Sequence, residues 1–399
     1  MMKTKLAIIG AGPAGLTLAN ALLQRGFGDF VVLEKESEVG GLCRSRDVDG
    51  SPLDIGGGHF LDVRRPKVTE FLFGFMPEAE WDRYERDSRI SIHGQMIGSP
   101  FEANIWQLDK AHQDRYLADI AAAGCNSEAP MPKAFVDWIY WKLGKGIAED
   151  YMLPYNRKMF GDDLNQLGTY WLEKLPNVSY EDTLRSCKEH RPYAQQPGHA
   201  IFYYPKKFGY GEVWRRMGEA LGGRLLLNMP AKALDVVNHV INSDIEAEVI
   251  VNTSPWTAFE SIAGISAAAR DAIDALKHTS VDIEYVGKNL DTPAQWIYLP
   301  DPSLPEHRLL VRHNFCPGSR GYWKETRRER SPELKPGTER FTMDYAYPLN
   351  TIGKNELMRS LLDELAASKV HGLGRWGEWQ HYNSDLVVDL ALKFADRMQ

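Results

Sequence analysis

The chain has 399 residues, of which 43% are hydrophobic and 25% charged, and its formal net charge is −7. This length exceeds one small core and predicts two or three domains, while the acidic balance argues against a nucleic-acid-binding surface. Four cysteines without CxxC spacing argue against a zinc site and a disulfide framework, so a reducing cytoplasmic location is expected. No apolar stretch reaches the roughly 18 to 20 residues that span a bilayer, so neither a membrane span nor secretion is expected.

The N-terminal segment carries the pattern of a dinucleotide-binding fold. An apolar run, a glycine turn, a helical pattern and a second apolar run follow one another, in segments 6–9, Gly10-Ala11-Gly12-Pro13-Ala14-Gly15, and 30–34. Three glycines permit a tight turn, close approach of a pyrophosphate and packing of the helix on the sheet, and the helix N-terminus faces the phosphates. The alternative is a glycine-rich turn that binds nothing; the strand–helix–strand context favours dinucleotide binding.

The residues after the second strand indicate FAD rather than NAD. Glu34, nineteen residues after Gly15, is placed to bind an adenosine ribose, and Lys35 follows it. A pair of glycines then precedes Leu42 and Arg44, and a strand follows that ends in Gly56-Gly57-Gly58-His59. This pattern resembles the FAD-binding amine-oxidase and sugar-mutase superfamily. Glycines let the chain run beside a large flat cofactor, and Arg44 offers a fork for its diphosphate, although residues 56–58 could also be a plain turn.

The middle of the chain is predicted to be mostly helical. Apolar residues at three- and four-residue spacing mark helices between residue 66 and about residue 145, and residues 89–97 alternate around His93-Gly94 as a hairpin would. Trp138 and Trp141 are expected in the core. The aromatic residues of segment 155–161 could line a cleft, although composition alone favours core packing.

The C-terminal half alternates between sheet and helix. Residues 248–253 are read as the last strand of the nucleotide domain, which would carry Thr253 past the cofactor. Four strands are predicted at 280–285, 294–299, 307–313 and 339–347, forming a sheet that could roof the flavin. A helix at 357–366 and a short strand near residue 370 follow. A final helix from about Asp385 is preceded by the cap residues Asn383 and Ser384, and its end could donate N–H groups to the cofactor.

These elements predict an α/β fold: a Rossmann-like FAD-binding domain with a helical insertion and a mainly antiparallel β-sheet substrate domain. The FAD-binding domain is expected in three parts, with helices in the first gap and the substrate sheet in the second. The predicted boundaries are 1–65, 181–255 and 349–399 for the FAD-binding domain, 66–180 for the helical domain and 256–348 for the antiparallel sheet.

Several later segments resemble the UDP-galactopyranose mutase family of FAD enzymes, and the resemblance covers nearly the whole chain. The segments that carry it are Tyr155-Asn156-Arg157-Lys158-Met159-Phe160-Gly161, His307-Arg308-Leu309-Leu310 through Asn314-Phe315, Tyr345-Ala346-Tyr347-Pro348, and Gly374-Arg375-Trp376-Gly377-Glu378-Trp379 with Asn383 and Asp385. The last segment differs from the small-residue-rich closing motif of amine oxidases.

The resemblance implies roles for particular residues. Tyr155, with Asn156 beside it, would stack on the nucleobase, Phe160 would border the sugar, and Arg308, Tyr347 and Tyr382 would bind the diphosphate. Arg375 would face the FAD pyrophosphate, and His59 would tune the flavin. With the residues read from the motifs above, the expected cofactor-binding set is Gly10, Gly12, Pro13, Ala14, Gly15, Glu34, Lys35, Gly41, Leu42, Arg44, Gly57, Gly58, His59, Thr253, Arg375, Asn383, Ser384 and Asp385. For Arg308 a surface ion pair, and for Tyr382 a core position, remain alternatives.

The activity implied is a pyranose–furanose isomerisation of a nucleotide sugar, in which N5 of reduced FAD attacks the anomeric carbon. An external reductant, NAD(P)H or a reductase, would keep the flavin reduced, and a homo-oligomer is possible. Three positions depart from the family: Phe160 replaces a tryptophan, Lys174 an arginine of a mobile loop in bacterial members, and Asp62 a histidine. The nucleotide-sugar mutase class is therefore better supported than UDP-galactose as substrate. A FAD-dependent amine or sugar oxidase, and a flavin-binding protein with a degenerate site, remain alternatives.

Overall fold

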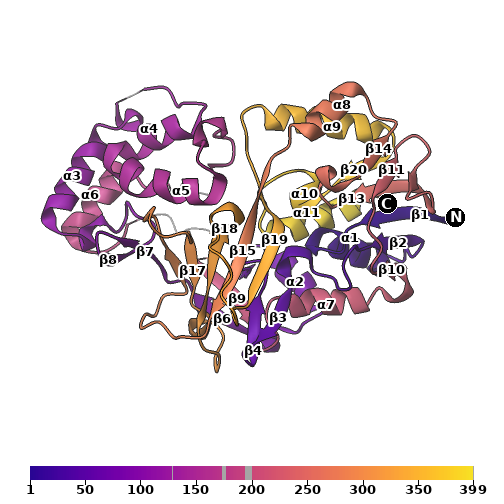
Figure 1. Ribbon diagram of the computed structural model, residues 1–399, viewed down its shortest axis with the longest axis horizontal. Coiled ribbons are helices and arrows are strands. Elements are labelled where there is room, and N and C mark those ends of the chain that lie inside the picture. Colours follow the sequence, from indigo (N-terminus) through magenta and orange to yellow (C-terminus); the bar gives the residue numbers. More distant parts are fainter. Residues whose placement is uncertain (128, 173–176, 194–199, 399) are drawn as a thin grey trace.

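The computed structural model describes residues 1–127, 129–172, 177–193 and 200–398. Its dinucleotide-binding half lies on the right of Figure 1, a group of helices lies on the left, and an antiparallel sheet connects the two below. Among the described residues, no helix is both long enough and apolar enough to cross a membrane. The predicted α/β architecture is confirmed, with one mixed sheet, one largely antiparallel sheet and a helical layer.

The dinucleotide-binding half is built on an eight-stranded sheet. Its central strand β1 (Met2–Ile9) pairs in parallel with β2 (Phe30–Leu33) and β13 (Ile245–Asn252). Residues 6–9, 30–33 and 250–252 of these strands are buried and almost all apolar, because both faces of the sheet are covered there. The prediction that residues 248–253 form the last strand is wrong, because the later strand β20 also pairs with β13. The remaining strands are β10 (Leu225–Leu226), β11 (Ala233–Asp235), β12 (Val240–Ile241), β14 (Ser261–Ala263) and β20 (Val370–Gly372).

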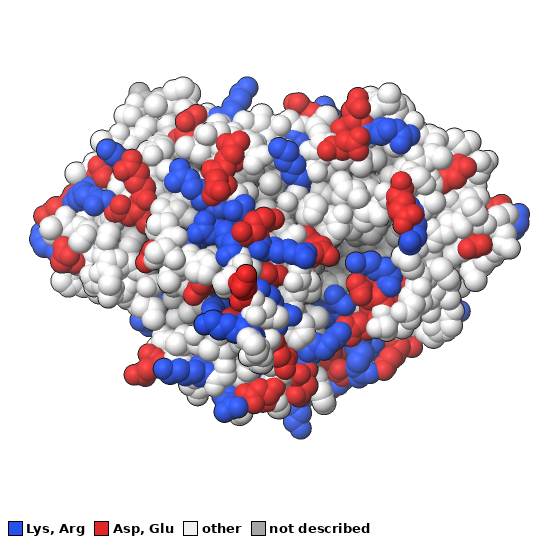
Figure 2. Space-filling model, viewed as in Figure 1, with Lys and Arg blue, Asp and Glu red and all other residues white. Residues whose placement is uncertain are grey.

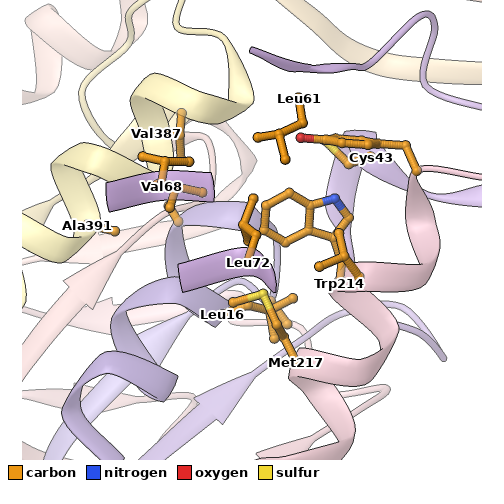
Figure 3. Packing of buried hydrophobic residues seen from close by; sticks show 14 of the residues in the cluster. Leu16, Cys43, Leu61, Val68, Leu72, Trp214, Met217, Val387 and Ala391 are labelled. Atoms are coloured by element: carbon orange, nitrogen blue, oxygen red, sulfur yellow. The ribbon is translucent and has the colours of Figure 1, made fainter. Parts of the chain in front are cut away.

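Helices pack on this sheet through two apolar clusters, the first of which contains Trp214. Trp214, which is fully buried, lies at the centre of the part drawn in Figure 3. The helices that meet there are α1 (Pro13–Gln24), α2 (Pro66–Phe73), α7 (Gly211–Glu219) and α11 (Ser384–Arg397). They contribute, among others, Leu16, Val68, Leu72, Met217, Val387 and Ala391.

A second sheet of seven strands has the order β19-β15-β18-β17-β16-β7-β8. The hairpin predicted around His93-Gly94 is confirmed, and both residues have positive φ (50° and 73°), as a two-residue turn of type I′ requires. The hairpin belongs to this sheet, since β7 pairs with β16, although it was placed in the helical segment. Strand β18 was not predicted. The strands are β7 (Ser88–Ile92), β8 (Gln95–Gly98), β15 (His278–Val286), β16 (Trp296–Tyr298), β17 (Arg308–Leu310), β18 (Tyr322–Arg327) and β19 (Arg340–Pro348).

The outer surface of the second sheet is covered by charges of both signs. Glu284 of β15, for example, pairs with Arg340 at 2.8 Å and with Lys324 at 3.2 Å. Figure 2 shows acidic and basic side chains interleaved over these strands. On this face, the mixture gives no single-signed field that would attract a nucleic acid.

The helical layer comprises α3 (Lys110–Ala121), α4 (Phe135–Ile147), α5 (Leu153–Phe160) and α6 (Tyr180–Glu189). A π-helical turn at Ala148–Met152 joins α4 to α5, and such turns recur at functional sites. Helix α6 packs against α3, so the layer extends past the boundary predicted at residue 180. The other elements are β3 (Ser45–Val48), β4 (Ser51–Asp54), β5 (Leu61–Asp62), β6 (Trp81–Glu85), β9 (Ile201–Pro205), α8 (Ala267–Asp274), α9 (Lys354–Ala367) and α10 (Gly374–Gly377).

Candidate functional site

Two glycine turns face each other at the N-terminus of α1 and form a cradle with walls of backbone. A Cβ on Gly15 would lie 1.9 Å from the Gly10 carbonyl oxygen, so only glycine lets the helix pack there. A Cβ on Gly12 would meet only the Gly41 Cα, at 3.8 Å, and would project into the space between the turns. Gly40 donates its N–H to the Ala11 carbonyl at 2.8 Å, which fixes the second turn against the first. The cradle therefore fits a pyrophosphate at the positive end of α1.

Glu34 lies at the edge of this cradle, as a ribose-binding carboxylate would. Its two oxygens accept N–H groups of Ala11 (2.8 Å) and Glu36 (3.0 Å), and each keeps a lone pair for another donor. Burial raises the pKa of Glu34, and the two N–H groups oppose that shift. Thr253 also borders the turn, since its hydroxyl donates to the Ile9 carbonyl at 2.8 Å.

Two predicted cofactor ligands near the cradle are held by protein groups. Arg44 donates to the Gly41 carbonyl at 2.9 Å and to Glu38 at 3.2 Å, so its guanidinium braces the second glycine turn. Lys35 is exposed and pairs with Glu36 at 3.2 Å. Whether either side chain also contacts a diphosphate stays a prediction.

Two cavities, of about 630 Å³ and about 180 Å³, share part of their walls. The larger one lies among α4, α5, β17 and the N-terminus of α11, and the smaller one is bordered by residues 56–60. The side chains that line both are Arg86, Arg308, Tyr347, His381 and Asn383. A group bound in one cavity would therefore be within reach of a group bound in the other.

The smaller cavity has the features expected beside a flat cofactor. A Cβ on Gly56 would lie 1.8 Å from the Leu42 carbonyl oxygen, and one on Gly58 would lie 2.1 Å from the Leu310 side chain, so a side chain at either position would displace its neighbour. His59 is part-buried, its Nε2 is shielded from solvent, and among the described residues this atom has no hydrogen-bond partner. Burial lowers the pKa of His59 to about 3, and the positive charge of Arg375 adds to this effect, so the imidazole is neutral. An unsatisfied polar atom beside a glycine strip fits a flavin, which presents nitrogen and carbonyl groups at its edge.

Arg308, Glu325 and Tyr347 form a connected group between the cavities. Arg308 of β17 donates Nε to Glu325 at 2.8 Å, its Nη2 also contacts Glu325, and the Tyr347 hydroxyl lies 3.4 Å from Nη2. Glu325 also accepts the Gly58 N–H at 3.1 Å. Burial raises the pKa of Glu325, but Arg308, His307 and this N–H outweigh it and hold the pKa at about 2. The carboxylate is therefore ionised and fixes the guanidinium beside the glycine strip.

The C-terminal segment reaches the same place. Arg375 donates to the carbonyls of Tyr382, at 2.9 and 2.7 Å, and of Ala346, at 3.0 Å, and it lines the smaller cavity. The preceding glycine packs on α1, so Arg375 lies between the cradle and the cavity. Asn383 caps α11 without a side-chain hydrogen bond to the helix and lines both cavities. Ser384 contacts the Tyr210 hydroxyl at 2.9 Å, and Asp385 pairs with Arg65 at 2.5 Å.

Tyr155, Asn156 and Phe160 all line the larger cavity. Tyr155 stacks on Tyr151, with ring centres 5.8 Å apart, and Asn156 donates to the Met152 carbonyl at 2.7 Å. Phe160 meets Tyr347 edge to face at 6.3 Å. Composition alone favoured core packing for this segment. These residues are indeed buried, but they also line the cavity, as the alternative of a cleft predicted.

Three other residues, two of them predicted for the site, differ from this group. Lys158 is turned away from the cavity and donates to the carbonyls of Leu299 (2.7 Å) and Glu306 (2.9 Å). The Tyr382 side chain is not among those lining either cavity and packs on the core, whereas His381 and Asn383 on either side of it do line them. Lys174 lies outside the described residues.

Four residues of the site were not predicted from the sequence: Arg86, Glu325, Tyr298 and His381. Glu325 lies on the unpredicted strand β18, and Arg86 lies in the short link between β6 and β7. Neither is part of a motif, and both reach the site only through the pairing of distant strands. His381 directly precedes Tyr382, which was predicted to bind the diphosphate. This adjacency is the sequence signal that could have indicated His381.

Comparisons with known proteins agree with this geometry. Residues 8–73 match the model of an NAD(P)-binding Rossmann-like domain. The structure of reduced UDP-galactopyranose mutase superposes with a TM-score of 0.89 over 100% of this chain and 94% of that one, at 23% sequence identity. The chain has the UDP-galactopyranose mutase fold. Putrescine oxidase bound to putrescine superposes less well, with a TM-score of 0.61 at 15% identity, over 100% of this chain and 99% of that one.

Curated relatives match only in part. A Baeyer-Villiger monooxygenase of Pseudomonas aeruginosa is 25% identical over 134 residues, which are 30% of this chain and 24% of that protein. A protein of Methanothermococcus thermolithotrophicus, named for its position in the nifH2 3′ region, is 50% identical over 52 residues, 13% of this chain and 49% of that protein. The chain thus aligns with under half the length of these relatives. Together with the mutase fold, the comparisons support FAD as the dinucleotide of this domain.

Proposed function

We propose that this protein is a flavin-dependent nucleotide-sugar mutase that interconverts the pyranose and furanose forms of its substrate. The observation that carries the proposal is the position of Arg308 and Tyr347, which line both the small glycine-walled cavity and the large aromatic-walled cavity. A nucleotide sugar with its base in the large cavity would place its diphosphate at their junction and its sugar toward the small one. The mutase fold of the whole chain supports the same reading.

The chain's own residues would bind and orient the substrate. Arg308, held by Glu325, would bind the diphosphate, and the Tyr347 hydroxyl would donate to it without adding charge. Tyr155 and the aromatic residues around it would hold the nucleobase, and Phe160 would border the sugar. Enclosure in these walls keeps the departed diphosphate close, so that its return is effectively intramolecular.

The cofactor would be held by the cradle, Glu34, Arg375 and the N-terminus of α11. Reduced FAD, when bound, supplies a nucleophilic nitrogen for the anomeric carbon of the sugar. His59 is neutral and lines the smaller cavity, so it can hydrogen-bond the cofactor without contributing a charge.

An amine oxidase is the main alternative, because putrescine oxidase shares the general fold. The charge of the larger cavity argues against it. Arg64, Arg65, Arg86 and Arg308 all line this cavity, against the carboxyl groups of Glu102 and Asp385. Burial raises the pKa of Glu102 and so favours its neutral form. Three of these arginines are themselves paired with carboxylates, Arg64 with Asp62, Arg65 with Asp385 and Arg308 with Glu325. Among the described residues, the lining therefore offers the ammonium groups of a polyamine no ionised carboxylate without an arginine partner, whereas Arg308 and Tyr347 can donate to a diphosphate.

An anaerobic assay tests the proposal. The FAD-loaded enzyme, reduced with dithionite, is mixed with UDP-galactopyranose or other UDP-hexoses, and the products are separated by chromatography. Interconversion of ring forms without consumption of an oxidant is expected, with Arg308→Ala as the impaired control. Turnover that requires oxygen or another acceptor would identify an oxidase, and steady isomerisation by the fully oxidised enzyme would contradict the proposed chemistry.

A further inference from the structure

One carboxyl group in the described wall of the larger cavity is buried without a partner from another residue. Glu102 lies in the segment between β8 and α3, lines the cavity and is only 8% exposed. Among the described residues, its carboxyl group accepts a hydrogen bond only from its own backbone N–H, and the one cation that acts on it, Lys142, forms no ion pair with it. Asp385, the other acidic residue of the described lining, pairs with Arg65 at 2.5 Å.

The surroundings of Glu102 favour its neutral form. Burial raises the pKa of this carboxyl group, and its own N–H and the charge of Lys142 oppose that shift without reversing it. A neutral carboxyl group carries one O–H donor beside one carbonyl acceptor. A buried polar group without a partner costs free energy, which a ligand that supplies the missing hydrogen bonds recovers when it binds.

Glu102 lies next to a row of aromatic rings. The ring of Phe101 stacks on Tyr151 with centres 5.4 Å apart, and Tyr151 stacks on Tyr155 at 5.8 Å. These three residues and Glu102 line the larger cavity but not the smaller one, so they belong to the part of the wall that the two cavities do not share. A base that stacks on Tyr155 would therefore lie in the part of the cavity that contains Glu102.

Aromatic rings hold a base by its face and do not select among bases, because every base has a π face. Selection requires hydrogen bonds to the edge of the base, where the patterns of donors and acceptors differ. Asn156 also lines this cavity, but its amide N–H already donates to the Met152 carbonyl at 2.7 Å. The carboxyl group of Glu102 has no such commitment to another residue among those described.

We propose that Glu102 selects the nucleobase of the substrate, through hydrogen bonds between its carboxyl group and an edge of the base that carries a donor beside an acceptor. The inference rests on the proposed nucleotide-sugar substrate and names the residue that decides which base is accepted. Uracil, cytosine and adenine present such an edge. Guanine also presents two adjacent donors, which are the complement of an ionised carboxylate, so the choice of base reports the form of Glu102 that binds.

Calorimetry on the oxidised, FAD-loaded protein measures this recognition without turnover. The ligands are UDP, CDP, ADP and GDP, which share the ribose and the diphosphate and differ only in the base. Glu102→Leu removes both hydrogen-bonding groups at similar size, and Glu102→Gln keeps a donor beside an acceptor. Glu149→Leu is the matched control, because it makes the same substitution at an exposed position outside the lining.

Glu102→Leu should weaken the nucleotide that wild type binds best on the order of tenfold and bring the four affinities closer together. Glu102→Gln should keep the wild-type order of the bases, and the control should match wild type. Because Glu102 has no partner residue to lose among those described, Glu102→Leu should leave the midpoint of urea unfolding unchanged or raise it. A residue that only supports the cavity wall would instead lower this midpoint.

Several results would overturn the inference. They are equal affinities of wild type for all four nucleotides, no binding of any of them, or wild-type affinities in Glu102→Leu. A lower unfolding midpoint with equal weakening of all four nucleotides would also overturn it, as would a preference for GDP that is lost in Glu102→Gln, since that pattern requires an ionised carboxylate. If Glu102→Leu does not fold, Glu102→Asp withdraws the carboxyl group by one methylene and should reduce the discrimination between bases in the same way.

The outcomes separate this inference from the proposed function. Base selection that depends on Glu102, in a protein whose reduced form isomerises no nucleotide sugar, would remove the mutase and keep the selecting residue. Isomerisation by wild type and Glu102→Leu alike, with equal KM values for each nucleotide sugar, would keep the mutase and remove Glu102 from the recognition of the base.

Discussion

The glycine cradle and the larger cavity are built from different kinds of atoms. The cradle consists of backbone from two short segments, residues 10–15 and 40–41, and its shape depends on side chains being absent. The larger cavity consists of side chains contributed by segments from Arg64 to Leu386. The first therefore tolerates almost no substitution, whereas the second can change its ligand by exchanging single side chains on the same fold.

The sharpest test of this difference is Gly12→Val. The added methyl groups would occupy the space between Gly12 and Gly41, so the protein should bind no FAD while still folding. The measurement is flavin absorbance per chain after purification and after incubation with FAD. Gly223→Val is the control, because a Cβ there meets nothing within 4 Å, and it should remain yellow. Normal FAD content in Gly12→Val would show that the cradle does not hold the pyrophosphate.

Arg308→Ala should have the next largest effect, on activity and on stability. Loss of a charge-assisted contact should lower kcat/KM on the order of ten- to a hundredfold, with Arg308→Lys between. Removal of one partner from a buried ion pair also destabilises by about 3 to 5 kcal/mol, because Glu325 is only 1% exposed.

A double variant separates these two effects. In Arg308→Ala with Glu325→Gln, no buried charge is left unpaired, so stability measured by urea unfolding should recover in part. Activity should stay low, and FAD should remain bound. Recovery of activity together with stability would mean that Arg308 only supports the fold.

The glycine cradle could be predicted because the residues that form it lie close together in the sequence. The turn, the following helix and Glu34 lie within one segment of the chain, and the structure places them as the spacing requires. The same holds for the hairpin at His93-Gly94, where turn chemistry and alternation agree.

The larger cavity could be predicted only where a family resemblance named its residues. Arg86 reaches it, and Glu325 reaches the smaller cavity beside it, through strand pairing between segments far apart in the chain, which no local pattern encodes. Lys158 belongs to the segment whose aromatic residues were expected to line a cleft, but this buried lysine turns toward nearby carbonyl groups, which belong to the loop after β16.

The buried carboxyl group of Asp54 predicts a pH dependence of the free energy of unfolding. Asp54 accepts hydrogen bonds from Ser45 (2.6 Å), the Tyr204 hydroxyl (3.1 Å) and the Tyr210 N–H (3.1 Å), and burial raises its pKa from 3.8 to about 7. Because the pKa in the folded state is the higher one, the contribution of this group to stability is complete below pH 3.8 and is lost as the pH rises through about 7.

Asp54→Asn does not titrate and should remove this loss, which is at most about 1.4 kcal/mol per pH unit. The free energy of unfolding in urea, measured between pH 5 and pH 8, should therefore fall less steeply in the variant than in wild type. Asp47→Asn, on the exposed face of β3, is the control and should follow wild type. Parallel curves for Asp54→Asn and wild type would show that Asp54 titrates alike in both states.

The smallest expected effect distinguishes two tyrosines that the sequence treats alike. Tyr347 lines both cavities with its hydroxyl 3.4 Å from Arg308, whereas the Tyr382 side chain packs on the core and only its carbonyl meets Arg375. A single neutral hydrogen bond contributes about 0.5 to 1.5 kcal/mol, so Tyr347→Phe should lower kcat/KM by about two- to tenfold. Tyr382→Phe should change it less, with FAD content equal in both variants. A larger loss in Tyr382→Phe would mean that the Tyr382 hydroxyl reaches the diphosphate when substrate is bound. The role implied by the family resemblance would then be correct, although the side chain packs on the core in this structure.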